Sequence, residues 1–124
     1  MMHRLLSLLL LLLPAAVLAQ QASFPEPDYD CGTVRRDTVL VHAFQVRNDG
    51  DAPLTLLQAV STCPCIQAEM PVRTLLPGEA GQIVVTFRPE GKRPGPFQQL
   101  VRVYTDSRQN PFLLHLKGSI CTEY

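Results

Sequence analysis

The segment Thr38–Val60, TVLVHAFQVRNDGDAPLTLLQAV, carries the strongest structural signal in this chain. Every second residue from Leu40 to Val46 is apolar or aromatic and belongs to one face, while Val41, Gln45 and Arg47 belong to the other. Because successive side chains of a strand point to opposite faces, this alternation predicts a half-buried β-strand. Asn48–Asp51 then favours a hairpin turn, since Asn, Asp and Gly tolerate a left-handed backbone. Leu54–Val60 is the predicted returning strand.

The same pattern continues on both sides of this segment, with turn residues between the alternating runs. Gly32 is expected to form a bulge, and Leu76–Glu79 is expected to form a type II turn because Pro precedes Gly. The chain therefore predicts an all-β, immunoglobulin-like sandwich of about seven antiparallel strands over residues 28–124, with a closed barrel as the alternative. The further expected strands are Asp28–Val34, Ile66–Glu69, Gln82–Arg88, Phe97–Thr105 and Phe112–Ile120.

The first residues are typical of a signal peptide. His3 and Arg4 precede the apolar run Leu5–Leu13, and Ala15–Ala19 ends in the small residue that signal peptidase accepts. A membrane anchor is the weaker interpretation, because a spanning helix needs about 20 apolar residues. We therefore expect residues 1–19 to be removed, residues 20–27 to form an extended lead-in, and the protein to be periplasmic or extracellular without membrane insertion after cleavage.

Charge and motif content argue against several function classes. The chain has 11 Lys and Arg against 11 Asp and Glu, which is too neutral for a typical nucleic-acid-binding domain. No Ser-His-Asp signature is present, and the basic segment Gly91–Gly95 lacks the setting of a phosphate-binding loop. His42 is expected to be a structural residue beside Phe44, and His115 is expected to be solvated. We expect no enzymatic activity and no cofactor.

Cys63-Pro64-Cys65 is the one local motif with chemical potential, and three roles compete for it. The favoured role is structural, as a tight turn whose cysteines are bridged, packed or free. The second is a soft-metal site for Cu(I) or Zn(II), because thiolates prefer such ions. Cys63 and Cys65 supply only two ligands, so Met70 and either Cys121 or His115 would have to complete the site. The third is a redox pair, because a bridge across one residue closes a small ring that is easily reduced.

A larger set of residues resembles a secreted bacterial family catalogued as domain of unknown function 1573, which is similar to Hydin-type and major-sperm-protein-type immunoglobulin-like domains. The resemblance implies a seven-stranded sandwich, export, and no established enzymatic role. This chain has Pro64 where the family usually has Gly, and Cys31 where it usually has Phe. The matching segments are Cys31–Val34, His42–Gly50, Pro53–Leu54, Ser61–Cys65, Leu76–Glu79, Val85–Phe87 and Leu114–Gly118.

Cys31 and Cys121 lie beyond the cysteines of this family pattern. They occur on the first and last predicted strands, which are often neighbours in such sandwiches, so we predict a Cys31–Cys121 disulfide. If the parallel register holds their Cα atoms farther apart than about 7 Å, pairing with Cys63 or Cys65 becomes preferable. The topology also predicts that Cys63–Cys65 lies at the pole opposite the Asn48–Gly50 turn.

The sequence thus favours a secreted or periplasmic binding or scaffolding module. Its expected partner is a protein or cell-surface component, contacted through loops or an exposed edge strand. The basic segment Gly91–Gly95 is interpreted as a solvated loop, with contact to an acidic partner or glycan as the alternative. The alternative function is soft-metal (Cu or Zn) binding at Cys63 and Cys65.

Overall fold

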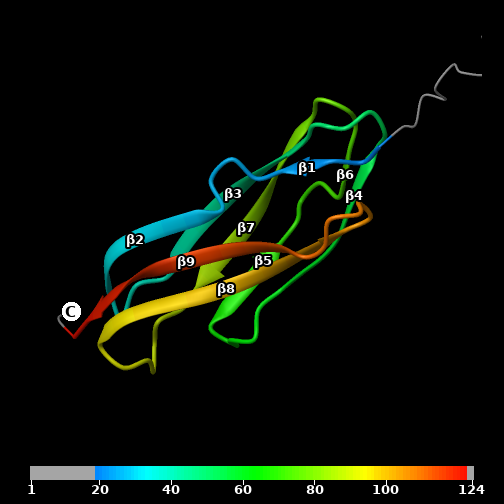
Figure 1. The fold of residues 1–124 in the computed structure, drawn as a ribbon. Helices are drawn as coiled ribbons and strands as arrows, with labels where there is room; N and C mark the ends of the chain where they lie inside the picture. Colours follow the sequence, from blue (N-terminus) through cyan, green and yellow to red (C-terminus); the bar gives the residue numbers. More distant parts are fainter. Residues whose placement is uncertain (1–18, 123–124) are drawn as a thin grey trace, which may run out of the picture.

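The computed structural model describes residues 19–122 and contains nine strands in that range (Figure 1). The predicted signal peptide lies outside the described residues, apart from Ala19. No helix of the length and hydropathy that a membrane crossing requires is found in the described range. The strands are β1 (Ala22–Ser23), β2 (Asp28–Arg35), β3 (Leu40–Asn48), β4 (Leu54–Val60), β5 (Ile66–Glu69), β6 (Thr74–Leu75), β7 (Ala80–Phe87), β8 (Gly95–Thr105) and β9 (Phe112–Cys121).

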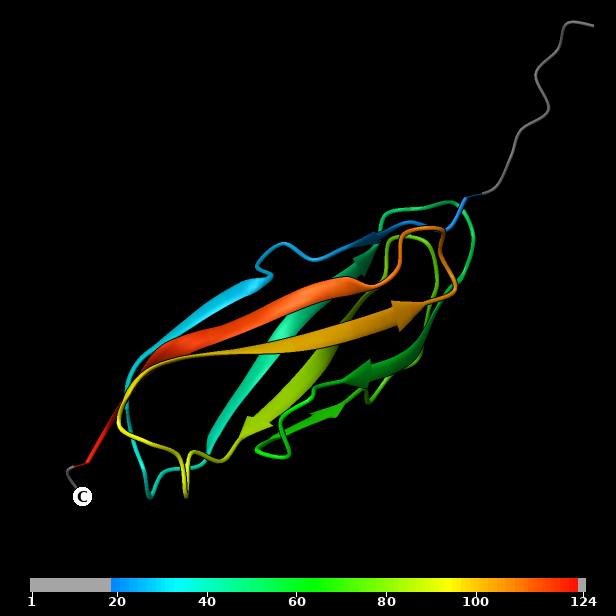
Figure 2. The ribbon, with the colours of Figure 1, turned by 60° about the horizontal axis from the view of Figure 1, so that its bottom comes forward.

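These strands form two stacked sheets, which confirms the predicted sandwich in preference to a closed barrel (Figures 1 and 2). The first sheet has the order β1-β3-β7-β5, and the second has the order β2-β9-β8-β4-β6. All pairs are antiparallel except β2 and β9, which run parallel. A bulge between Asp30 and Thr33 interrupts that parallel pair at the expected glycine, Gly32.

The strand bounds follow the sequence pattern closely. The predicted segments Leu54–Val60 and Ile66–Glu69 are β4 and β5 without any change of bounds. Two strands were not predicted: β1, inside the expected lead-in of residues 20–27, and β6. Each has two residues, which is too short to show an alternating pattern.

The core is built from the alternate side chains that the pattern assigns to the inner faces. Phe44 and Val46 on β3 are buried, and so are Ile83, Val85 and Phe87 on β7. The second sheet contributes a matching apolar face. Its fully buried side chains include Leu54, Leu56, Val101, Val103, Leu114 and Leu116.

The turn after β3 differs from its prediction. It does not form a hairpin, because β3 belongs to the first sheet and β4 to the second. Asn48, Asp49 and Gly50 all keep a negative φ. Gly50 is needed here for close approach instead: a Cβ at this position would clash with the Ala19 carbonyl oxygen and lie 2.7 Å from the Gln21 nitrogen.

A buried amide holds this turn. Asn48 is fully buried, and its Nδ2 donates to the carbonyl oxygens of Ala52 at 2.9 Å and Leu75 at 2.8 Å. Its Oδ1 accepts from Gly50 N at 2.9 Å. Because Leu75 belongs to β6, the Asn48 side chain connects the end of the first sheet to an edge strand of the second. Sequence reasoning treated Asn48 only as a turn former.

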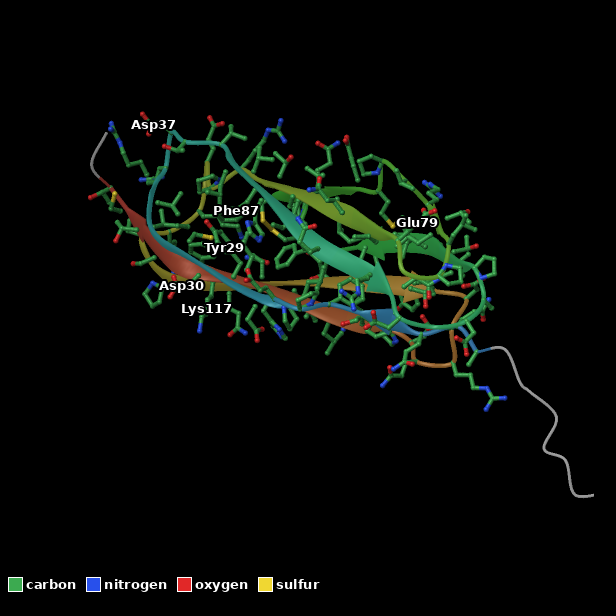
Figure 3. The ribbon with its side chains drawn as sticks, turned by 90° about the horizontal axis from the view of Figure 1, so that it is seen from above. Tyr29, Asp30, Asp37, Glu79, Phe87 and Lys117 are labelled. Atoms are coloured by element: carbon green, nitrogen blue, oxygen red, sulfur yellow. A yellow bond between two sulfur atoms is a disulfide. The ribbon has the colours of Figure 1, made fainter. Side chains whose placement is uncertain are left out.

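The sandwich has two poles, and Figure 3 shows Asp37 and Glu79 at opposite ends of the molecule. The Asn48–Asp51 turn shares one pole with the Leu76–Glu79 turn, where Gly78 has φ +84° as a type II turn requires. The opposite end, which we call the cysteine pole, contains the loops of residues 36–39, 61–65 and 88–94. The predicted placement of Cys63–Cys65 away from the Asn48 turn is therefore confirmed.

We predict that Asn48→Ala lowers the free energy of unfolding by about 2–3 kcal/mol. The substitution removes the partner of the buried Leu75 carbonyl and of two part-buried groups, the Ala52 carbonyl and the Gly50 N–H, and the loss of a buried partner costs roughly 1–3 kcal/mol before relaxation. Urea denaturation followed by circular dichroism measures the change. Gln45→Ala, on the exposed face of the same strand, is the matched control and should stay within about 0.5 kcal/mol. Equal stability of the two variants would contradict the role of the amide.

Candidate functional site

Cys63 and Cys65 form a disulfide in the loop that joins β4 to β5. Their Cα atoms lie 5.1 Å apart, and a single residue, Pro64, separates them. Ile66 N donates to the Cys63 carbonyl at 3.1 Å, which closes the turn before β5 begins. Both cysteines are half-buried and pack against the core, whereas Pro64 is exposed. Figure 3 shows the sulfur–sulfur bond close to Phe87.

One backbone N–H donates to the first of the two sulfurs. Cys65 N lies 3.3 Å from Cys63 Sγ and donates to it. Cys63 N donates in turn to the Ser61 hydroxyl at 3.4 Å. Cys63 Sγ is therefore already placed against a donor, and a negative charge on that atom would strengthen the contact.

An open hollow of about 480 Å³ lies beside the disulfide. Arg88 N donates to the Cys65 carbonyl at 2.9 Å, so the two residues are direct cross-strand neighbours. Cys65 and Arg88 both line the hollow. Lys92 reaches the hollow after a turn closed by its N–H on the Pro89 carbonyl at 3.0 Å. The hollow is lined by Cys63, Pro64, Cys65, Arg88, Glu90, Gly91 and Lys92.

Positive charge predominates at the cysteine pole. Arg88 and Lys92 line the hollow with Glu90 as its one acidic residue. A smaller hollow of about 250 Å³ joins the same loop to Arg36 and Asp37. Asp37 also pairs with Arg35 at 3.6 Å. The basic segment Gly91–Gly95 is thus a loop whose Lys92 lines the hollow beside the disulfide, a neighbour that the sequence did not assign to it.

The predicted Cys31–Cys121 bridge is wrong. The two residues lie on adjacent parallel strands, but the register places Cys121 opposite Arg35, four residues beyond Cys31. At about 3.3 Å per residue this offset exceeds the roughly 7 Å that a disulfide can span. Burial raises the pKa of the half-buried Cys31 thiol, and the nearby Asp30 charge adds to the effect.

The structure does not bring the other proposed metal ligands to Cys63 and Cys65. His115 lies within β9 and contacts Asp28 Oδ1 through Nδ1 at 2.9 Å. Met70 follows the far end of β5 and lines a different hollow, and Cys121 does not line the hollow at the disulfide. Within residues 19–122 no group of three His, Cys, Asp or Glu side chains has a metal-binding arrangement. Soft-metal binding would also require reduction, because the two sulfurs are bonded to each other.

His42 has an aromatic environment, as its place beside Phe44 suggested. Its ring stacks on Tyr29 with centroids 3.6 Å apart and meets Phe44 edge-on at 4.6 Å. Burial lowers the pKa of His42, and the Glu26 charge opposes this effect to a smaller degree. These contacts tie β2 to β3 across the two sheets, so the histidine has a structural role.

A second concave region, which we call the lateral groove, lies between β4 and β5. It has a volume of about 410 Å³ and is lined by Leu57, Gln58, Ala59, Ala68, Glu69, Met70, Pro71 and Arg73. Figure 2 shows β4 and β5, both in green, side by side at the lower edge of the sandwich. The sequence predicts Ile66–Glu69 as a short edge strand, and β5 is indeed the edge of the first sheet. That it borders this groove could not be predicted, because local alternation does not report strand order across two sheets.

The family comparison matches most of the chain. The model described as "Protein of unknown function (DUF1573)" covers residues 22–120. A sequence comparison with curated proteins gives no match.

Solved structures resemble the fold at low sequence identity. A protein of unknown function from Porphyromonas gingivalis W83 aligns with a TM-score of 0.67 and 16% identity, over 87% of this chain and 50% of that one. This chain thus spans half the length of that structure. The ASH/PapD-like domain 7 of human CEP192 aligns at 0.69 and 12% identity, over 91% and 94%. The YadV chaperone aligns at 0.53 and 14% identity, over 85% and 52%. These identities establish a shared fold alone.

We predict that the Cys63→Ser/Cys65→Ser variant loses only about 1–2 kcal/mol of unfolding free energy. A bridge across one residue closes a very short loop, so it restricts the unfolded chain little. Urea denaturation of the oxidised protein, the reduced protein and the variant measures the difference. A loss above about 4 kcal/mol would show that the disulfide is essential to the sandwich.

We also predict that His42 contributes to destabilisation in acid. Its pKa is lowered in the folded state, so the unfolded chain takes up the proton first as the pH falls through about 6.5. Stability is therefore complete above that pH and declines below it. Between pH 7.5 and pH 5, urea unfolding should show a smaller loss for His42→Phe than for the unmodified protein. Equal losses in the two proteins would rule out this linkage.

Proposed function

The chain belongs to the family described as "Protein of unknown function (DUF1573)", and within it we propose that this protein is a non-catalytic binding module that takes an extended segment of a partner protein into the lateral groove. The observation that supports this proposal most strongly is the uncovered outer edge of β5. This strand ends the first sheet, and no strand of residues 19–122 pairs with its outer side. An unpaired edge offers backbone donors and acceptors to an incoming strand.

The backbone direction of β5 supports this proposal. Arg88 N donates to the Cys65 carbonyl, so the N–H and C=O groups of residues 67 and 69 also face β7. The corresponding groups of Ala68 therefore point away from β7, toward the groove. A peptide strand there would satisfy them without disturbing the existing sheet.

The opposite wall of the groove is also an edge. β6 pairs with Leu54 and Thr55, and the Leu56 N–H donates to the Arg73 carbonyl at 2.7 Å, so β4 continues without a partner strand on that side beyond Leu56. Leu57 is 50% exposed at this wall, and Met70 packs on the core at the other. An extended segment with apolar side chains at alternate positions would match two backbone edges whose lining includes the apolar side chains of Leu57 and Met70.

The predicted signal peptide supports export, with the periplasm or the cell exterior as the place of action. The partner is accordingly a protein or a cell-surface component that is accessible there. Binding through backbone edges requires no cofactor, nucleic acid or inserted membrane segment.

The test is a selection from a displayed library of random peptides against the purified protein. Selected peptides should carry alternating apolar residues, and Leu57→Glu should weaken their binding about tenfold or more by placing a charge on the groove wall. Leu113→Glu is the matched control, because Leu113 is 45% exposed on β9 and lies outside the groove. It should leave the affinity unchanged.

Amide chemical shifts locate the bound peptide. Binding in the groove should change the amide chemical shifts of residues 66–70 most strongly. Equal sensitivity to both leucine substitutions, or shifts centred on another surface, would overturn the proposal.

A further inference from the structure

We propose that the Cys63–Cys65 disulfide is an exchange site that is reduced by an acidic thiol, meaning a thiol compound that also carries carboxylates. This activity goes beyond partner binding in the lateral groove. It rests on the cysteine pole, whose hollow has a different set of lining residues.

The small ring that the disulfide closes can open without unfolding the protein. The bridge spans one intervening residue, so its opening releases little chain and little stability. The core is closed by buried apolar residues of both sheets, and the two cysteines only pack against its margin. The sandwich can therefore keep its fold in both oxidation states, as an exchange site requires.

The hollow gives a small thiol access to the disulfide. Half-buried cysteines line an open hollow of about 480 Å³, which is large enough to admit a small peptide-like molecule. Disulfides that are exposed or closed across short loops exchange more readily than bridges buried in a core. Pro64 fixes its own φ, so the two sulfurs remain close after reduction and can close again.

Charge identifies the reductant. Arg88 and Lys92 stand on the hollow with Glu90 as the single acidic lining residue. An approaching thiolate is negative, and carboxylates on the same molecule add to its attraction toward the two cations. A cationic thiol gains nothing from this arrangement.

The exchange proceeds in two balanced steps. The incoming thiolate attacks Cys65 Sγ and forms a mixed disulfide, while the Cys63–Cys65 bond breaks and Cys63 leaves as a thiolate that later takes a proton. A second thiolate attacks the reagent sulfur of the mixed disulfide and releases Cys65 as a thiolate, which is also protonated. Two thiols are thereby oxidised to one external disulfide, and the protein gains two electrons and two protons.

The hydrogen bonds favour attack at Cys65. When the bond breaks, the charge appears on Cys63 Sγ, against which Cys65 N is already placed at 3.3 Å. A donor to the thiolate lowers its pKa and makes it a better leaving group. Arg88, the cross-strand neighbour of Cys65, stands on the side from which the anion arrives.

The test compares glutathione, which is a net-negative thiol, with cysteamine, which is a cationic one. The oxidised protein is treated with each at low ionic strength, quenched in acid and alkylated, and peptide mass spectrometry follows Cys63 and Cys65. We expect millimolar glutathione to open the bridge at least about fivefold faster per thiolate than cysteamine. A bridge that stays closed in excess glutathione, while the protein remains folded, would overturn the proposal.

Two further measurements test the role of the cations. Arg88→Gln/Lys92→Gln should remove most of the glutathione preference, whereas Arg102→Gln/Arg108→Gln removes the same charge at residues that do not line the hollow and should retain it. In the unmodified protein, about 0.5 M salt should reduce the preference through screening, which tests the same point even if a variant folds poorly. A preference that survives salt or the first double substitution would show that Arg88 and Lys92 do not select the reductant.

Discussion

The chain crosses from one sheet to the other at residues 61–65, and both proposed sites depend on this crossing. β4 ends at Val60 in the second sheet, and β5 begins at Ile66 in the first. The backbone N–H and C=O groups of a strand need hydrogen-bond partners on both sides. The crossing leaves the facing edges of β4 and β5 with some of these groups unpaired by another strand. The lateral groove lies between those edges, and the tight reversal that makes the crossing carries the Cys63–Cys65 disulfide.

Local pattern was sufficient to predict most of the strands but not their assignment to sheets. The alternation in Leu54–Val60 and in Ile66–Glu69 reports which side chains are buried, and burial is the same whichever sheet a strand joins. Asn48–Asp51 has the composition of a hairpin turn, yet it connects the two sheets. What decides this is the Asn48 amide, whose contact with Leu75 joins residues far apart in sequence.

At the candidate site, contacts between residues close in sequence could be predicted, whereas contacts that depend on strand pairing could not. Neighbouring cysteines in a stiff turn can be expected to lie close together, and Cys63 and Cys65 do. Cys31 and Cys121 were paired from strand adjacency alone, and the bridge fails because the parallel register shifts them apart. The position of Arg88 beside Cys65 depends on the pairing of β5 with β7, so the charge around the disulfide became visible only in the folded chain.

Amide hydrogen exchange across β5 tests the crossing and its open edge most directly. Gln67 and Glu69 face β7, so their N–H groups should be protected, whereas the N–H of Ala68 faces the groove and should exchange rapidly. This alternation within three consecutive residues is the result that the account predicts. Strong protection of Ala68, equal to that of its neighbours, would show that another element covers the edge and would contradict the account.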